Sequence, residues 1–228
     1  MTNYILWDVD GTLVLNGKDA GNLYHEAIEL AIGESIAVRL PNTHGKTDGQ
    51  ILRESLAAHG LDENLHSSAS EHLDALSRLR HESGNHRELA PGVAEAIATT
   101  ARAGWVNALL TGNSANRSRY KITGAGLCAE DFSWDHSYFG HVTPVRSNLT
   151  LQAVSDHPGD TLVIVGDTPG DDKAATAAGI PFIAVATGVF TADQLRETGA
   201  VLVVDDLFSG LPAVMEMLSA IVATANSR

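Results

Sequence analysis

Two aspartates lie two positions apart near the N-terminus, within Asp8-Val9-Asp10-Gly11-Thr12-Leu13. They directly follow the short apolar run 4–7, and Gly11 allows the chain to turn after them. The first carboxylate can therefore face a substrate while the second reaches past it, as acid–base or nucleophilic chemistry requires. Because Asp next to Gly is also common in ordinary turns, this pair alone fits a simple turn equally well.

A second acidic group follows another apolar run, 161–165. It stands in the segment Gly166-Asp167-Thr168-Pro169-Gly170-Asp171-Asp172. Clusters of carboxylate oxygens without nitrogen or sulfur ligands suit the hard cation Mg²⁺. Two acidic loops at the ends of two buried strands would also concentrate negative charge, which is costly unless a metal offsets it. The sequence therefore predicts a metal site here.

A third polar segment, Thr111-Gly112-Asn113-Ser114, follows the apolar run 106–110. It offers the Thr111 hydroxyl and then opens a helix, whose free N–H groups can hold phosphate oxygens. Taken alone, Asn113 or Ser114 is equally explained as a helix cap. Arg146 precedes Asp167 by 21 positions in an otherwise neutral stretch. Its planar guanidinium could clamp phosphate oxygens and restrain a nucleophile, although an isolated arginine is more often solvated surface.

These segments need a scaffold that brings strand ends together. Apolar runs that read as buried strands alternate with helix-like segments, which is typical of a doubly wound parallel α/β sheet. The expected strands are 4–7, 106–110, 161–165, 181–185 and 200–204, and the expected helices are 92–103, 114–124, 148–156, 171–178, 191–198 and 208–224. Ligands of such sheets bind beyond the carboxyl ends of the strands, so we expect the polar strand ends to share one crevice.

Residues 16–88 break this alternation. Helix-like segments near 19–32, 48–59 and 63–83 have no convincing strand among them. We therefore predict a small α-helical cap at 16–88 inserted into an α/β core formed by 1–15 and 89–228. Thr47 and Gln50 have the spacing of a capping box for the middle helix, and 81–88 is the expected polar hinge.

Composition narrows the function further. With 228 residues and 44% hydrophobic content, the chain suits one mid-sized domain, or a core with a smaller insertion. The formal charge of −13 disfavours nucleic acid and anionic membrane surfaces as partners. No run of about 18 apolar residues and no basic leader is present, so we expect a cytoplasmic protein. A monomer is the default expectation. Cys128 is the single cysteine and is expected to be a small buried hydrophobe.

In order and spacing these motifs resemble the haloacid dehalogenase (HAD) superfamily of hydrolases, over nearly the whole chain. The DxDGTL signature matches residues 8–13, the threonine of the second motif matches Thr111, and the GDxxxD motif matches Asp167 with Asp171. The insertion after the first motif looks like the helical cap of the subgroup that contains phosphoglycolate phosphatases and β-phosphoglucomutases.

This resemblance implies a Mg²⁺-dependent phosphatase that acts on a small phosphorylated metabolite, such as phosphoglycolate or a sugar phosphate. It implies that Asp8 attacks phosphorus to form an aspartyl-phosphate, while Asp10 protonates the leaving alcohol and later activates water. Thr111 and the neighbouring amides of Gly112 and Asn113 would bind the phosphoryl oxygens.

The same resemblance implies a set of metal ligands. Mg²⁺ would be held by the carboxylates of Asp8 and Asp167 and by the main-chain carbonyl of Asp10, with Asp171 or Asp172 binding through water. Which of the two adjacent aspartates takes part is left open.

One motif departs from the family pattern. The third motif is usually a lysine, commonly beside a proline, whereas this chain has Thr143-Pro144-Val145-Arg146. We predict that Arg146 takes this place, with Lys121 and then Lys173 as the alternatives.

The cap offers the polar stretch His44-Gly45-Lys46-Thr47-Asp48 as a substrate-facing loop. His44 and Lys46 are the predicted substrate contacts. The alternative is that Thr47 only caps a helix, Asp48 is only a favourable first-turn acid, and Lys46 is only a solvated side chain.

Several other functions share this fold. The resembling dehalogenases lack the second aspartate of the first motif, so Asp10 favours phosphoryl transfer. A phosphomutase stays possible, and so does a phosphonate hydrolase, which typically needs a cap lysine such as Lys46 or Lys18. A non-catalytic binding relative is disfavoured because the acids and Thr111 are intact.

Overall fold

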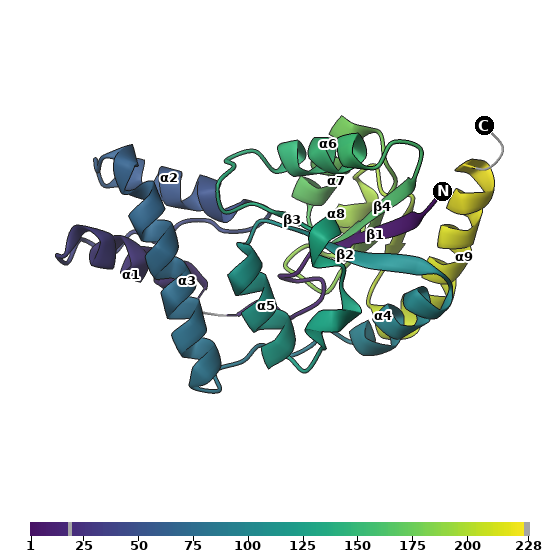
Figure 1. Ribbon diagram of the computed structural model, residues 1–228, viewed down its shortest axis with the longest axis horizontal. Helices are drawn as coiled ribbons and strands as arrows, with labels where there is room; N and C mark the ends of the chain where they lie inside the picture. The colour runs from purple at the N-terminus through teal and green to yellow at the C-terminus, as the bar shows by residue number, and fades with distance from the viewer. Residues whose placement is uncertain (18–19, 226–228) are drawn as a thin grey trace.

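The computed structural model describes residues 1–17 and 20–225. Lys18 and the expected helix start at residue 19 lie outside the described residues. Figure 1 shows two parts: a sheet flanked by helices on both faces, and a group of three helices, α1 to α3, beyond one end of the sheet.

The sheet has six parallel strands in the order β3-β2-β1-β4-β5-β6. The strands are β1 (Asn3–Trp7), β2 (Trp105–Thr111), β3 (Tyr138–Phe139), β4 (Thr161–Gly166), β5 (Phe182–Val185) and β6 (Leu202–Val204). The expected doubly wound parallel sheet is thus confirmed. The strand order reverses at β1, which lies between β2 and β4, and the carboxyl ends of these three strands meet there.

The core helices cover both faces of the sheet. They are α4 (Val93–Arg102), α5 (Ala115–Gly124), α6 (Arg146–Asp156), α7 (Pro169–Ala178), α8 (Ala192–Arg196) and α9 (Leu207–Ala225). Short 3₁₀ turns occupy Glu63–Leu65, Ala129–Asp131 and Trp134–His136. Helix α6 begins two residues before its expected start, and this places Arg146 in its first turn.

Strand β1 is apolar from Tyr4 to Trp7 because both of its faces are buried there. Ile5 and Trp7 pack with α4, α5 and α9 on one face, whereas Tyr4 and Leu6 pack with α6, α7 and α8 on the other. Such two-sided burial explains the continuous apolar runs of the sequence.

Helices α1 (Ala20–Ile32), α2 (Asp48–Ala58) and α3 (His66–Glu82) enclose a hydrophobic cluster of their own, separate from those of the sheet. At the junction the two connecting segments run side by side: Leu15 N–H donates to the Glu88 carbonyl at 2.9 Å. This arrangement is compatible with a helical cap, but the boundaries at 15/16 and 88/89 stay predictions.

Two local expectations can be compared with the structure. Thr47 caps α2 as expected, accepting from Gln50 N–H at 3.0 Å, but the Gln50 side chain donates to Glu54 and does not close a capping box. The expectation for Cys128 is wrong, since its side chain is exposed. It follows the tight turn at Gly126, just after the end of α5.

Within the described part of the chain, α9 is the one helix long and apolar enough to cross a membrane. This is a weak indication, because core helices of globular domains meet the same criterion. Val214 and Leu218 of α9 are fully buried in the sheet cluster that also includes residues of α4. Packing on the domain therefore accounts for part of its apolar character.

Candidate active site

Three polar strand ends meet at the reversal point of the sheet. Asp8 follows β1, Thr111 ends β2 and Asp167 follows β4, and the strands are in register at Trp7 with Leu109 and Val165. Gly11 has φ +88°, and a Cβ there would lie 2.2 Å from Asp167 Oδ2. A glycine is required at this turn so that the two acidic loops can touch.

Three carboxylates form a compact, buried cluster. Asp8, Asp167 and Asp171 each offer one oxygen, and these atoms lie within 4.8 Å of one another. Burial raises the pKa of Asp8 to about 7, aided by repulsion from Asp171 and opposed by Arg146. Burial and the charge of Asp8 also raise the pKa of Asp167 well above its usual range. The cluster carries more negative charge than its protein surroundings compensate.

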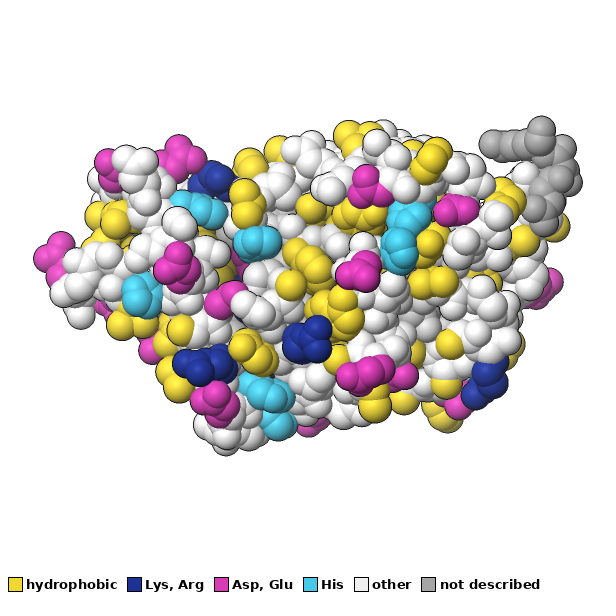
Figure 2. All heavy atoms as spheres, viewed as in Figure 1, with side chains coloured by type: hydrophobic (Ala, Val, Ile, Leu, Met, Phe, Trp, Pro, Cys, Tyr) yellow, Lys and Arg dark blue, Asp and Glu magenta, His cyan; other side chains and the backbone are white. Residues whose placement is uncertain are grey.

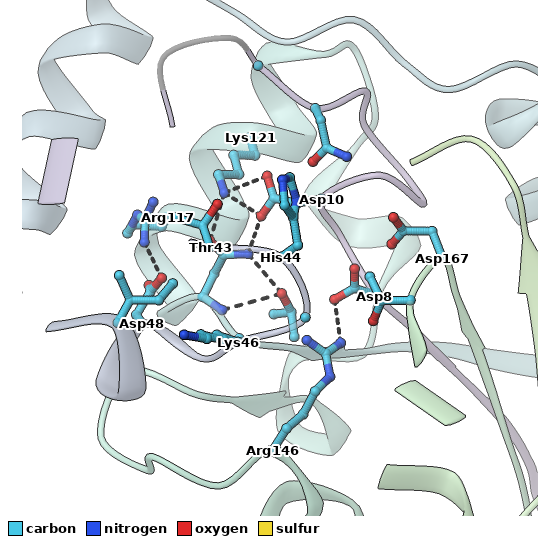
Figure 3. Close-up of a pocket in the computed structure, with 18 of the residues that line it drawn as sticks. Asp8, Asp10, Thr43, His44, Lys46, Asp48, Arg117, Lys121, Arg146 and Asp167 are labelled. Carbon is cyan, nitrogen blue, oxygen red and sulfur yellow. Dashed lines mark hydrogen bonds and ion pairs between the residues drawn. The ribbon is translucent and has the colours of Figure 1, made fainter. Parts of the chain in front are cut away.

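Arg146 supplies the cation of this cluster. Its Nη2 donates to Asp8 Oδ1 at 2.6 Å and to the Leu110 carbonyl at 3.2 Å (Figure 3). The same nitrogen lies 2.6 Å from Asp171 Oδ1, although that contact lacks hydrogen-bond alignment. One guanidinium against three carboxylates leaves two negative charges, which a divalent cation would balance. The oxygen-only ligand set suits Mg²⁺.

The two adjacent aspartates of α7 differ in orientation. Asp171 Oδ2 accepts from the Thr168 N–H and hydroxyl, and Thr168 Oγ1 accepts from the Asp171 N–H, which completes a capping box. This bonding holds Asp171 towards the cluster. Asp172 instead accepts from Gly199 N–H at 3.0 Å, so its carboxylate lies outside it.

Asp10 lines the same pocket as Asp8 but bonds to different partners. Lys121 Nζ donates to Asp10 Oδ1 at 2.7 Å, and Asn113 Nδ2 donates to Asp10 Oδ2 at 2.7 Å (Figure 3). Burial would raise the pKa of Asp10, but Lys121 and Asn113 outweigh it and hold the pKa below its usual range. The two aspartates therefore have different cationic partners: Arg146 for Asp8, and Lys121 for Asp10.

The three candidates for the third motif fall in different places. Arg146 contacts Asp8, Lys121 contacts Asp10, and Lys173 is exposed on α7. Only the position of Arg146 brings a cation to the predicted nucleophile.

The predicted phosphate-binding residues line the same pocket. Thr111 is buried, and its hydroxyl accepts from Asn113 Nδ2 at 2.8 Å. The Gly112 carbonyl accepts from Asp48 N–H at 2.7 Å, and a Cβ on Gly112 would lie 2.4 Å from the Lys46 carbonyl. Gly112 thus allows the loop before α2 to close over the end of β2.

That loop forms one wall of the pocket, which spans about 700 Å³ when the space open to solvent is included. Thr43, His44, Gly45 and Lys46 all line it. His44 is exposed, and Lys46 Nζ pairs with Glu54 at 2.5 Å. The structure therefore brings both predicted substrate contacts to the pocket. Lys46 is paired there with Glu54.

An ion pair between α2 and α5 was not anticipated. Asp48 pairs with Arg117 and accepts from the Tyr24 hydroxyl at 2.6 Å, and its second oxygen accepts from Ser114 N–H at 3.1 Å. All three side chains are at most 4% exposed. The available sequence cue was the i, i+4 spacing of Arg117 and Lys121, which places both on one helix face.

The Arg117 pairing yields a stability prediction. Arg117→Met should lower the free energy of unfolding by about 3–5 kcal/mol, because Asp48 would be left buried without its cation. Arg102→Met is the matched control, since Arg102 pairs with Glu95 on the surface and should contribute about 0–1 kcal/mol. Chemical denaturation of both variants measures the difference. Equal small losses would show that the buried pair adds nothing to the folded state.

Known proteins with similar sequences or folds include hydrolases and phosphatases. A HAD-hydrolase-like family model matches residues 144–209. A phosphoglycolate phosphatase from Pseudomonas savastanoi pv. phaseolicola is 25% identical over 226 residues, covering 93% of this chain and 80% of the relative.

Two solved structures share the fold. A hydrolase from Pseudomonas syringae has a TM-score of 0.67 at 18% identity, covering 95% of this chain and 99% of its own. CbbY from Rhodobacter sphaeroides, in complex with phosphate, has a TM-score of 0.62 at 20% identity, covering 92% and 96%.

The family model, the relative and the fold together confirm the resemblance to the HAD superfamily, in the subgroup of phosphoglycolate phosphatases and β-phosphoglucomutases. These similarities support an enzyme of the phosphohydrolase type.

Proposed function

We propose that the protein is a Mg²⁺-dependent phosphatase that hydrolyses a small organic phosphate monoester, related to phosphoglycolate or a sugar phosphate, through an aspartyl-phosphate. One observation carries the proposal: Asp8 lies in a buried carboxylate cluster beside Arg146, while Asp10 faces away towards Lys121. The similarity to phosphoglycolate phosphatases supports the substrate class.

In the first step a carboxylate oxygen of Asp8 bonds to phosphorus as the ester P–O bond breaks. Asp10 gives its proton to the departing oxygen. Lys121 and Asn113 keep Asp10 ionised in the resting site, and the negative charge of an incoming ester favours the uptake of that proton. Arg146 holds the Asp8 carboxylate in its attacking orientation.

In the second step Asp10, now ionised, removes a proton from water. The water oxygen bonds to phosphorus, the bond to Asp8 breaks, and phosphate is released. Thr111 and the amides of Gly112 and Asn113 would hold the phosphoryl oxygens at the start of α5. His44 and Lys46 would contact the rest of the substrate from the loop above.

The carboxylates of Asp8 and Asp167 would hold Mg²⁺, with Asp171 through water and the main-chain carbonyl of Asp10. Bound Mg²⁺ neutralises charge on the transferring group and orients it. Because the Asp172 carboxylate bonds to Gly199, Asp171 is the better candidate of the two α7 aspartates for the metal site.

Metal binding gives a prediction that is independent of turnover. Asp167→Asn should weaken Mg²⁺ binding by roughly 100-fold or more, since a direct ligand is lost and loss of an outer partner of a ligand alone costs about 10–100-fold. Asp172→Asn, one of the two adjacent acids of α7 but outside the cluster, is the control and should bind as the native protein does. Titration calorimetry with MgCl₂ on the resting protein measures both. Similar affinities in the two variants would remove Asp167 from the metal site.

Phosphate release from a panel of small phosphate esters, with Mg²⁺ and with chelator, tests the activity itself. Asp10 favours phosphoryl transfer over the dehalogenase reaction. A phosphomutase would instead return a phosphorylated product without free phosphate. Cytoplasmic location, a monomeric state and the absence of nucleic-acid and membrane partners stay predictions.

A further inference from the structure

Asp48, the first residue of α2, joins the helical part of the chain to the loop that follows β2. Its main-chain N–H donates to the Gly112 carbonyl at 2.7 Å, and its Oδ2 accepts from the Ser114 N–H at 3.1 Å. One residue of α2 therefore holds the two backbone groups on either side of Asn113. Residues 111–113 are those proposed to bind the phosphoryl group, so this contact bears on the site itself.

Asn113 is the residue whose position this contact fixes. Its Nδ2 donates to Asp10 Oδ2 at 2.7 Å and to the Thr111 hydroxyl at 2.8 Å, and its Oδ1 accepts from Lys121 Nζ at 2.7 Å. All of these bonds depend on where the backbone of Asn113 lies. A shift of the loop would therefore move both a partner of Asp10 and a partner of the hydroxyl proposed to bind phosphate.

The remaining contacts of Asp48 fix it against α5 and α1. Its Oδ1 pairs with Arg117 (Figure 3) and accepts from the Tyr24 hydroxyl at 2.6 Å. Acidic side chains are scattered over the visible face in Figure 2, whereas Asp48 is only 2% exposed. A buried ion pair adds little net stability, because burying both charges costs about as much as pairing them returns. Its directional bonds instead fix how the helices meet.

Two glycines beside Asp48 allow the backbones to approach closely. A Cβ on Gly49 would lie 2.9 Å from the Thr143 carbonyl oxygen, and one on Gly140 would lie 2.8 Å from the Gly112 carbonyl oxygen. Neither glycine has a left-handed φ, so the lack of space accounts for the missing side chain. Gly49 N–H also donates to the Gly140 carbonyl at 3.0 Å. The sequence thus permits main-chain contact between the start of α2 and the segment after β3.

We propose that Asp48 is a positioning residue for phosphoryl transfer, which holds the loop 112–114 in the form that binds the phosphoryl group. The site is then complete only when the start of α2 is docked on the sheet. This inference rests on the proposed function, in which residues 111–113 hold the phosphoryl oxygens. Asp48 touches no reacting atom in this role and acts through the loop.

Calorimetry with inorganic phosphate, in the presence of MgCl₂, tests this role without turnover. Asp48→Leu keeps a similar shape but removes both acceptor oxygens. Because Asp48 lines the active-site pocket, loss of its charge alone would strengthen the binding of an anion. Loss of positioning has the opposite sign: phosphate should bind roughly 10–100-fold more weakly, since about 1 Å of misplacement can cost up to about 100-fold.

Two further variants separate positioning from folding. Arg53→Met is the matched control, because Arg53 lies on the same helix and donates to the Val142 carbonyl at 2.9 Å but does not line the pocket. It should bind phosphate as the native protein does. Asp48→Leu/Arg117→Met replaces Asp48→Leu if that variant fails to fold, since it leaves neither charge of the pair unpartnered. The net charge of the pocket wall is then unchanged, and the same weakening is expected.

Steady-state phosphate release gives a second readout. A smaller amount of folded enzyme would lower the apparent kcat and leave KM unchanged, whereas a displaced phosphate loop should raise KM by about tenfold. Unchanged or tighter phosphate binding in the Asp48 variants, or an unchanged KM, would overturn the positioning role. Absence of release from every ester by the native protein would instead overturn the proposed function, while weaker phosphate binding in the Asp48 variants would still stand.

Discussion

Asp8→Asn is expected to lower Mg²⁺-dependent phosphate release by roughly 10⁴-fold or more, the scale of losing a nucleophile. The amide cannot form the bond to phosphorus that the carboxylate forms. The change is nearly isosteric at a buried position. It also removes a carboxyl group whose pKa is raised by burial. The variant should therefore be at least as stable as the native protein, so that lost turnover cannot be attributed to unfolding.

Steady-state phosphate release across the ester panel measures this loss, with a thermal melt of each variant. Asp172→Asn should retain turnover, because its carboxylate bonds to Gly199 outside the cluster. Turnover that survives Asp8→Asn would contradict Asp8 as the nucleophile, and turnover that persists fully in chelator would contradict the metal requirement.

Asp10→Asn is expected to lower kcat by about 10²–10⁴-fold, the range of general acid–base catalysis. Asn113 can still bond to the amide oxygen, so the local packing should persist. The loss should reach both steps, since the first needs a proton donor and the second a base.

Leaving groups separate the two roles of Asp10. An aryl phosphate needs little protonation of its leaving oxygen, so its first step should survive and the phosphoryl-enzyme should accumulate as a burst. An alkyl phosphate should be slow from the first turnover. Loss of less than about threefold with both esters would exclude Asp10 as the acid and base.

The sheet was largely predictable because its central strands are buried on both faces. The runs that precede Asp8, Thr111 and Asp167 are mostly apolar, with Asn107 as a buried polar exception, and polar residues stand where each strand ends. Strand β3 was missed since Tyr138 and Phe139 alone are too short to give a periodic pattern. The strand order was not written in any local pattern, because it depends on how distant segments pair.

The residues of the site that follow strand ends were predictable from the local sequence, whereas their orientations were not. Carboxyl ends of neighbouring parallel strands must meet, and so Asp8 and Asp167 were expected together. The choice between Asp171 and Asp172 depended on helix geometry, since adjacent residues point in different directions and the Thr168 cap selects one.

Side-chain pairs between residues far apart in the chain could not be predicted from the sequence. Asp48 and Arg117 stand far apart in the chain, and nothing local indicates that α2 and α5 bring them into contact. The same holds for Arg87, which appeared as part of a polar hinge and lines the active-site pocket in the fold. Cys128 was assigned to the interior from its residue type alone, and the turn that exposes it was not recognised.

The most direct test of phosphoryl transfer to Asp8 is a single turnover in water enriched in heavy oxygen, combined with acid quenching and mass spectrometry of the peptide that contains Asp8. We predict a phosphoryl group trapped on that peptide, heavy oxygen in the released phosphate and none in the Asp8 carboxylate. Heavy oxygen in the Asp8 carboxylate, or labelled phosphate without any phosphorylated peptide, would contradict the proposed mechanism.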